Sequence, residues 1–155
     1  MSLSNSDLFH TAWVVPDLAV AMESFRTVGL RLTEPREWSI VVGRPNLAPT
    51  TFSIQVAFSC DGPLYVELIQ GAAGSPWEPL ANGAMHHIAW WVSDLRKSIA
   101  MLESESHVLE SWMVGDDGGP ERFAYMRAPG GQLVEIVDVA IRPDLMAWFG
   151  GEAHA

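Results

Sequence analysis

The stretch HTAWVVPDL at residues 10–18 returns 77 residues later as HIAWWVSDL at residues 87–95. Both copies begin with histidine, place alanine third and tryptophan fourth, and end in Asp-Leu. A second repeat pairs LYVELI at residues 64–69 with QLVEIV at residues 132–137, so that two glutamates lie 68 residues apart. A 155-residue chain with these repeats is predicted to be a single domain, residues 1–155, built from two similar modules.

Each module is predicted to contain one strand, one helix and three further strands. Apolar residues after Asp17 recur at helical spacing as far as Gly29, which places a helix behind the first strand. Strands are expected at residues 8–15, 38–42, 52–58 and 64–69, with a loop that contains Pro45 and Pro49. Module 1 therefore covers about residues 8–70, module 2 about residues 86–138, and a C-terminal tail, residues 139–155, is expected to contain a short helix at 143–149.

The amino-acid composition favours a folded globular protein and disfavours several kinds of binding partner. A hydrophobic content of 48% indicates a folded globular chain, and a net charge of −10 disfavours nucleic acid and anionic membranes as partners. No apolar run approaches the length of about 18 residues that a membrane span needs, and no signal peptide is evident, so a soluble cytoplasmic protein is expected. The single cysteine, Cys60, beside the Asp61-Gly62-Pro63 turn, fits a reducing compartment and a strand-end thiol.

Four side chains in the repeats are candidate metal ligands: His10, Glu67, His87 and Glu135. Each glutamate has apolar neighbours in its strand, where an ionised carboxylate is costly to bury without compensation. A histidine alone or a glutamate alone is usually structural, but the same pair at matching positions of a repeat favours one explanation. Two neutral imidazoles and two carboxylates suit a divalent metal ion in both charge and ligand type.

Several motifs then resemble those of the vicinal oxygen chelate superfamily, which includes glyoxalase I, methylmalonyl-CoA epimerase, extradiol dioxygenases and bleomycin-binding proteins. The motifs are FHTA at residues 9–12, LYVEL at 64–68, HHIAW at 86–90 and YMRAPGGQLVE at 125–135. This resemblance implies an α+β fold in which two repeated βαβββ modules form a cupped mixed sheet around a metal site. It further implies one divalent ion held by the four candidate ligands, a small-molecule substrate and a homodimer.

The ligand set resembles bacterial glyoxalase I, whereas HHIAW resembles the epimerase. Val14 occupies the position of an arginine that binds glutathione in glyoxalase I. Gln55 stands nearest to the position of a second glutamate base in the epimerase. The resemblance thus favours the superfamily without choosing between these two reactions.

The main functional hypothesis is a metal-dependent isomerase, epimerase or lyase that stabilises an enolate-type intermediate of an oxygen-chelating substrate. The resemblance assigns the role of general base to Glu135, with Glu67 as the other catalytic candidate. The metal is one of nickel, zinc, cobalt, manganese, magnesium and iron. Candidates to line the substrate pocket are Gln55, Tyr125, Trp38 and Trp112.

Two alternatives stay open from the sequence. An extradiol dioxygenase would hold iron(II) with two histidines and one carboxylate, and the additional Glu67 argues against it. A non-catalytic drug-binding protein would need no metal, and Trp38, Trp77 and Trp112 could line its pocket. His86, next to His87 but on the other side of the strand, is expected to support a ligand or to be structural rather than to coordinate the ion.

Overall fold

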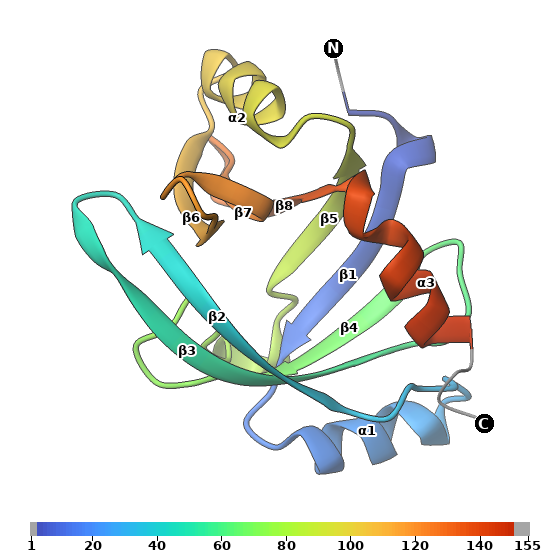
Figure 1. Cartoon of the computed structure of the whole chain (residues 1–155). Helices are drawn as coiled ribbons and strands as arrows, with labels where there is room; N and C mark the ends of the chain where they lie inside the picture. The colour runs from blue at the N-terminus through green and yellow to red at the C-terminus, as the bar shows by residue number, and fades with distance from the viewer. Residues whose placement is uncertain (1–2, 151–155) are drawn as a thin grey trace. The chain divides into compact units, whose positions relative to one another are not determined.

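The computed structural model describes residues 3–150, which form eight strands and three α-helices (Figure 1). The elements are β1 (Leu8–Val14), α1 (Leu18–Thr27), β2 (Arg36–Arg44), β3 (Leu47–Phe58), β4 (Tyr65–Gln70), β5 (His87–Val92), α2 (Leu95–Ser104), β6 (Val108–Val114), β7 (Pro120–Arg127), β8 (Leu133–Asp138) and α3 (Arg142–Gly150). The order β-α-β-β-β therefore occurs twice and α3 follows, which confirms the predicted α+β class with two βαβββ modules.

The chain groups into two compact units that do not coincide with the two modules. We call them the His10 unit (His10–Ser39, Phe52–His86 and the chain from Pro143) and the His87 unit (the chain up to Phe9, Ile40–Thr51 and His87–Arg142). The hairpin of β2 and β3 is divided between them. That the whole chain is a single domain stays a prediction.

In the His10 unit, β4 pairs with β1 in parallel and with β3 in antiparallel orientation. Helix α1 covers one face of these strands, where Leu18 and Met22 pack with Ala57 and Leu68 (Figure 1). Trp13 packs in this same cluster. The alternation of side chains along a strand leaves His10, Ala12 and Val14 on the opposite face.

The His87 unit repeats this arrangement. β8 pairs with β5 in parallel and with β7 in antiparallel orientation, and β7 also pairs with β6. Helix α2 packs on Ala124, Met126 and Ile136 through Ile99 and Leu102. Pairing of Val42 with Met113 adds the end of β2 to β6, so the strands follow one another in the order β1-β4-β3-β2-β6-β7-β8-β5.

Both α-helices of the repeat begin after the aspartate of the Asp-Leu pair that ends each copy of the motif. The side chain of Asp17 accepts a hydrogen bond from the backbone N–H of Val20, and that of Asp94 accepts one from Lys97, each at 3.0 Å. A carboxylate at this position satisfies an N–H that the first helical turn leaves without a partner. Gly29 follows α1 at φ = +97°, a conformation that glycine adopts without steric cost, so the helix ends where the sequence predicted.

The expected loop at Pro45 and Pro49 is much shorter in the structure. Pro45 and Asn46 alone connect β2 to β3, and Pro49 lies inside β3. Asn46 has φ = +61°, which permits the tight reversal, and proline is tolerated in a strand where its missing N–H faces no partner strand. Residues 45–51 are all exposed, so Pro49 lies on a hairpin end where this tolerance applies.

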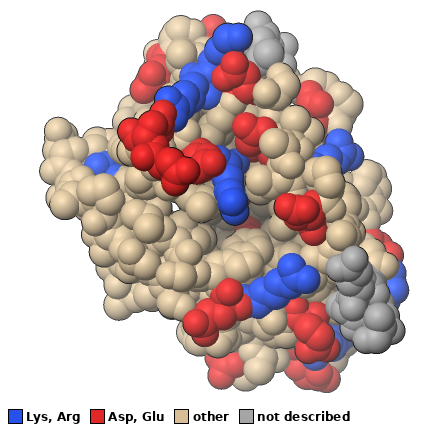
Figure 2. Space-filling view, in the orientation of Figure 1, with Lys and Arg blue, Asp and Glu red and all other residues tan. Residues whose placement is uncertain are grey.

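Charged groups are distributed unevenly along the chain. Arg44 is the only charged residue between residues 38 and 60, whereas the protein as a whole has a net charge of −10. In Figure 2, acidic and basic side chains lie interspersed over much of the face shown, and the region at the left, where Figure 1 places the hairpin of β2 and β3, is mainly uncharged. None of the described helices is both long and apolar enough to cross a membrane.

Gly43 allows β2 to lie close to Trp112 of β6, with which it pairs. A Cβ atom at Gly43 would lie 2.7 Å from Cζ2 of this indole and closer still to Cε2 and Nε1. We therefore expect Gly43→Ala to lower the free energy of unfolding by about 1–3 kcal/mol, the usual cost of overpacking, in urea denaturation. Gly150→Ala is the control, because a Cβ there meets no atom within 4 Å among the described residues; an equal loss in both variants would contradict this explanation.

Candidate metal centre

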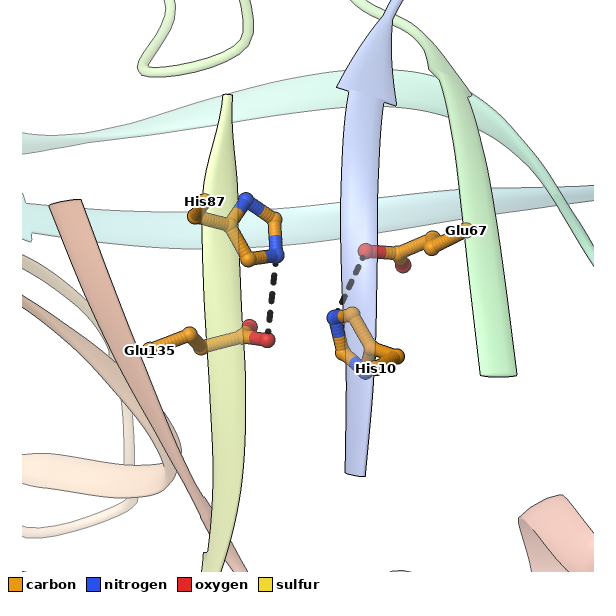
Figure 3. Close-up of side chains that lie close together, drawn as sticks. All are labelled: His10, Glu67, His87 and Glu135. Carbon is orange, nitrogen blue, oxygen red and sulfur yellow. Dashed lines mark ion pairs between the residues drawn. The ribbon is translucent and has the colours of Figure 1, made fainter. Parts of the chain in front are cut away.

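The His10 unit contains the first histidine and glutamate pair. His10 lies on β1 and Glu67 on β4, and the parallel register places Glu67 beside Ala12, two residues beyond His10 on the same face. Nε2 of His10 is 3.1 Å from Oε2 of Glu67, and the side chains are only 2% and 7% exposed. Figure 3 shows the two side chains pointing toward each other from neighbouring strands.

The His87 unit contains the second pair in the same register. Glu135 on β8 lies beside Ala89 of β5, again two residues beyond the histidine. Nε2 of His87 is 3.3 Å from Oε2 of Glu135, with side chains 0% and 8% exposed (Figure 3). The sequence repeat is thus a repeat of side-chain geometry as well.

The repeated alanines have a structural explanation in this register. Ala12 and Ala89 are fully buried and lie directly beside Glu67 and Glu135 on the paired strand. A larger side chain at either position would compete with the neighbouring carboxylate for space on the same face. The third position of each copy of the motif therefore preserves the room in which the glutamate approaches the histidine.

The strand on the other side of each glutamate strand, β3 in one unit and β7 in the other, carries a different ring in each unit. Phe58 of β3 pairs with Glu67, and its ring lies edge-on to His10 with centroids 5.4 Å apart. Tyr125 of β7 pairs with Glu135, and its ring lies edge-on to His87 at 5.0 Å. Phe58 and Tyr125 therefore occupy equivalent positions, and only the second supplies a hydroxyl group.

These pairs have the donor types that a divalent ion requires. All four side chains are buried, and in each pair an imidazole nitrogen faces a carboxylate oxygen. A nitrogen and an oxygen this close share either a proton or a metal cation. If the imidazole is neutral, the carboxylate keeps a negative charge, and burial of that charge is unfavourable unless a cation compensates it. Imidazole and carboxylate ligands together suit zinc and the other first-row metals. The residues present therefore fit the metal that the sequence predicted.

The four candidate pocket residues lie in different environments. Tyr125 shares the face of Glu135, and the ring of Trp38 contacts Trp148 of α3 with centroids 5.5 Å apart. Gln55 is exposed. It lies two residues before Ala57 on β3 and therefore on the face that α1 covers, opposite to the face of Phe58. Trp112 packs against the cluster beneath α2. Two of the four thus point away from the faces of the histidines and glutamates.

His86 and Cys60 have structural environments. Nε2 of His86 lies 2.9 Å from the carbonyl oxygen of Pro76, and its backbone N–H donates to the carbonyl oxygen of Ala12, the neighbour of Glu67. Burial raises the pKa of the Cys60 thiol, against a smaller opposing effect of Arg31. A raised pKa reduces the thiolate fraction, which agrees with a strand-end thiol rather than a nucleophile.

Most of the chain matches a known protein family in sequence. The model of the Glyoxalase/Bleomycin resistance protein/Dioxygenase superfamily matches residues 9–125, about three quarters of the chain. The chain belongs to this superfamily. The match includes His10, Glu67 and His87 and ends before Glu135, and it confirms the family that the motifs resembled. No curated protein matches the chain in sequence.

Solved structures agree on the fold of this superfamily member. Methylmalonyl-CoA epimerase from Mycobacterium tuberculosis is 20% identical, with 88% of this chain and 92% of that chain covered and a TM-score of 0.56. A selenomethionine form of methylmalonyl-CoA epimerase is also 20% identical, covers 84% and 93%, and gives a TM-score of 0.53. At this identity the likeness concerns the fold alone.

The sequence did not identify the residues that surround the two histidines without being candidate ligands. Phe58 was expected only as part of a strand. Yet Phe58 follows an alanine and lies nine residues before Glu67, and Tyr125 follows an alanine and lies ten residues before Glu135. That repeat could have identified the two equivalent rings. Ser111, which pairs with Tyr125 and is 2% exposed, has no signal in the sequence.

Proposed function

We propose that this protein is a metal-dependent isomerase or lyase of the glyoxalase kind, acting on a small substrate that binds through its oxygens. His10, Glu67, His87 and Glu135 would together hold one divalent ion. The observation that carries the proposal is the histidine and glutamate pair, buried and in identical register in both units. Burial of a charged carboxylate is unfavourable in both pairs. One divalent cation bound by both pairs would balance the charges of the two carboxylates and so explain both.

The ion, when bound, would supply a Lewis acid that polarises a substrate carbonyl or related oxygen. The ligand set admits nickel, zinc, cobalt, manganese, magnesium or iron, and its two carboxylates favour a metal that accepts both nitrogen and oxygen ligands. The remaining chemistry depends on side chains of this chain.

Glu135 is the proposed general base. Its carboxylate would take a proton from the carbon beside the polarised carbonyl and return it to the same or the neighbouring carbon, so that no other reactant is consumed. Nε2 of His87 lies 3.3 Å from Oε2 of Glu135, so this base is next to the ligand set between the two transfers. Glu67 has the same position in the other unit and is the alternative base.

Tyr125 supports the choice of Glu135. It pairs with this glutamate across β7 and β8, whereas Glu67 has Phe58 at the equivalent position. A phenol can donate a hydrogen bond to an oxygen on which negative charge develops, and a phenyl ring cannot. We therefore place the proton transfer in the His87 unit.

Metal analysis of the purified protein tests the proposal. We expect close to one divalent ion per chain by mass spectrometry of the acid-digested protein, and a lower melting temperature after removal of the ion by a chelator. A chain that is isolated without metal and cannot be loaded with any of the six metals would refute the proposal. Saturable quenching of tryptophan fluorescence by an unaltered ligand in metal-free protein would then favour a drug-binding role.

Two further expectations accompany this function. A homodimer is expected from the family resemblance, and light scattering of the purified protein would measure its mass against the 17.0 kDa of one chain. A cytoplasmic location agrees with the single cysteine and is tested by cell fractionation.

A further inference from the structure

Within the His10 unit, the end of helix α3 packs on residues that neighbour the first histidine and glutamate pair. The ring centroid of Phe149 lies 4.5 Å from that of Phe58 on β3 and 4.9 Å from that of Tyr65 on β4. Side chains alternate along a strand, so Tyr65 shares the face of Glu67, two residues further along β4. One aromatic side chain of α3 therefore contacts neighbours of the proposed ligands on two strands.

Phe58 connects α3 to both members of the pair. Its ring lies edge-on to the imidazole of His10, with centroids 5.4 Å apart, and its backbone pairs with Glu67 across β3 and β4. Phe149 and Trp148 contact the same Phe58 ring, at 4.5 Å and 5.6 Å between centroids. A ring in a packed cluster can turn only if its neighbours move. These contacts therefore restrict the Phe58 ring and, through it, the rotation of the imidazole about its side-chain bonds.

Further contacts hold the end of α3 in place. Trp148, which is only 1% exposed, lies 5.5 Å from Trp38 of β2 between ring centroids. The guanidinium carbon of Arg36, also on β2, lies 4.5 Å from the centre of the Trp148 ring, a cation–π contact. The hydroxyl group of Tyr65 donates to Sδ of Met146 at 3.4 Å. The helix is thus fixed to β2, β3 and β4 and can act as a rigid support for Phe58.

We infer that Phe58 and Phe149 are positioning residues for the metal ion: they hold the His10 imidazole with Nε2 3.1 Å from Oε2 of Glu67 before the ion binds. A side chain that is already oriented loses little conformational freedom on binding, so it binds an ion more tightly than a freely rotating one. The support comes from a segment outside the family match, which ends at residue 125. The inference rests on the proposed function, because it treats His10 and Glu67 as ligands.

Phe149→Ala tests the inference, because it removes the ring that packs on Phe58 and changes no ligand. The dissociation constant for zinc is measured by competition with a chromophoric chelator, and the visible absorption spectrum of the cobalt(II)-loaded protein reports the ligand geometry. We expect the zinc affinity to fall by about 10–100-fold, the cost of losing an outer partner of a ligand, and the cobalt bands to change. Phe149→Leu keeps much of the apolar volume and is expected to restore most of the affinity and the spectrum.

Phe58→Leu gives the same test if Phe149→Ala does not fold, because it replaces the ring that contacts His10 and keeps an apolar side chain. It is expected to weaken zinc binding and to change the cobalt spectrum in the same direction.

Met22→Ala is the matched control. Met22 is 3% exposed, against 2% for Phe149, and packs with α1 on the opposite face of the same unit. Urea denaturation should show a loss of stability in this variant, whereas its zinc affinity and cobalt spectrum, measured on folded protein, stay those of the wild type. Wild-type affinity and spectrum in the folded Phe149→Ala or Phe58→Leu protein would overturn the positioning role and leave the proposed function standing, as would an equal loss of affinity in Met22→Ala. Failure of the wild-type protein to bind any of the six metals would overturn both.

Discussion

Replacing His10 with alanine is expected to remove the divalent ion from the protein. The change deletes one imidazole ligand and leaves the Glu67 carboxylate buried without the ring that lies 3.1 Å from it. We expect the metal affinity to fall by more than the roughly 10–100-fold that loss of an outer supporting partner costs. Competition with a chromophoric chelator measures this affinity, and metal content after dialysis gives a second readout.

Loss of folding would imitate loss of metal and needs its own controls. Removal of one partner of a buried pair costs about 3–5 kcal/mol, so His10→Ala is compared with the double variant His10→Ala/Glu67→Ala, which removes both partners. His86→Ala is the matched single control, because His86 is also a buried histidine but bonds to the carbonyl oxygen of Pro76. Unchanged metal content in a folded His10→Ala protein would exclude His10 as a ligand.

Replacing Glu135 with glutamine is expected to abolish proton transfer while substrate binding stays measurable. Glutamine keeps the size and the hydrogen-bonding capacity of the side chain but cannot accept a proton as a carboxylate does. A positioned general base contributes about 10²–10⁴-fold to a rate, and we expect a loss in that range. Exchange of substrate C–H for C–D in D2O, followed by NMR with 2-oxo aldehydes as hemithioacetals and with acyl-CoA thioesters, reports the transfer directly.

Glu67→Gln provides the comparison for this variant. Both glutamates lie in the same register beside a buried alanine, and they differ in the ring that pairs with them, Phe58 for Glu67 and Tyr125 for Glu135. We expect Glu67→Gln to weaken metal binding and, at saturating metal, to retain more exchange activity than Glu135→Gln. The reverse order of activities would assign the base to Glu67.

The repeat made the fold and the two pairs predictable. Strand β1 and the N-terminus of α1 lie where the sequence placed them to within one residue, because strand alternation, helical spacing and capping are local properties. His10 and Glu67 could be placed together in advance, because the same buried charge at matching positions of a repeat favoured one shared partner. The turn at Asn46 was misjudged because two prolines suggested a loop, whereas one residue with positive φ sufficed for the reversal.

Features that occur in only one copy of the repeat could not be predicted by comparing the two copies. The tail was expected as a helix, and α3 confirms it, but no repeat exists to indicate which face Trp148 and Phe149 contact. Gln55 and Trp112 were chosen for their residue type and their place in the chain. The faces on which they lie depend on strand registers that their own segments do not determine.

The division of the chain into units has a consequence for how the protein can be taken apart. Ile40–Thr51 from the first half of the sequence belongs with the strands of the second half, and the chain from Pro143 onward belongs with the first. Val42 pairs with Met113, a residue that a fragment ending between residues 71 and 86 would lack. A chain cut between residues 71 and 86 would therefore give two fragments that complete each other's sheets rather than two small proteins. The repeat is a unit of sequence, whereas folding requires both copies at once.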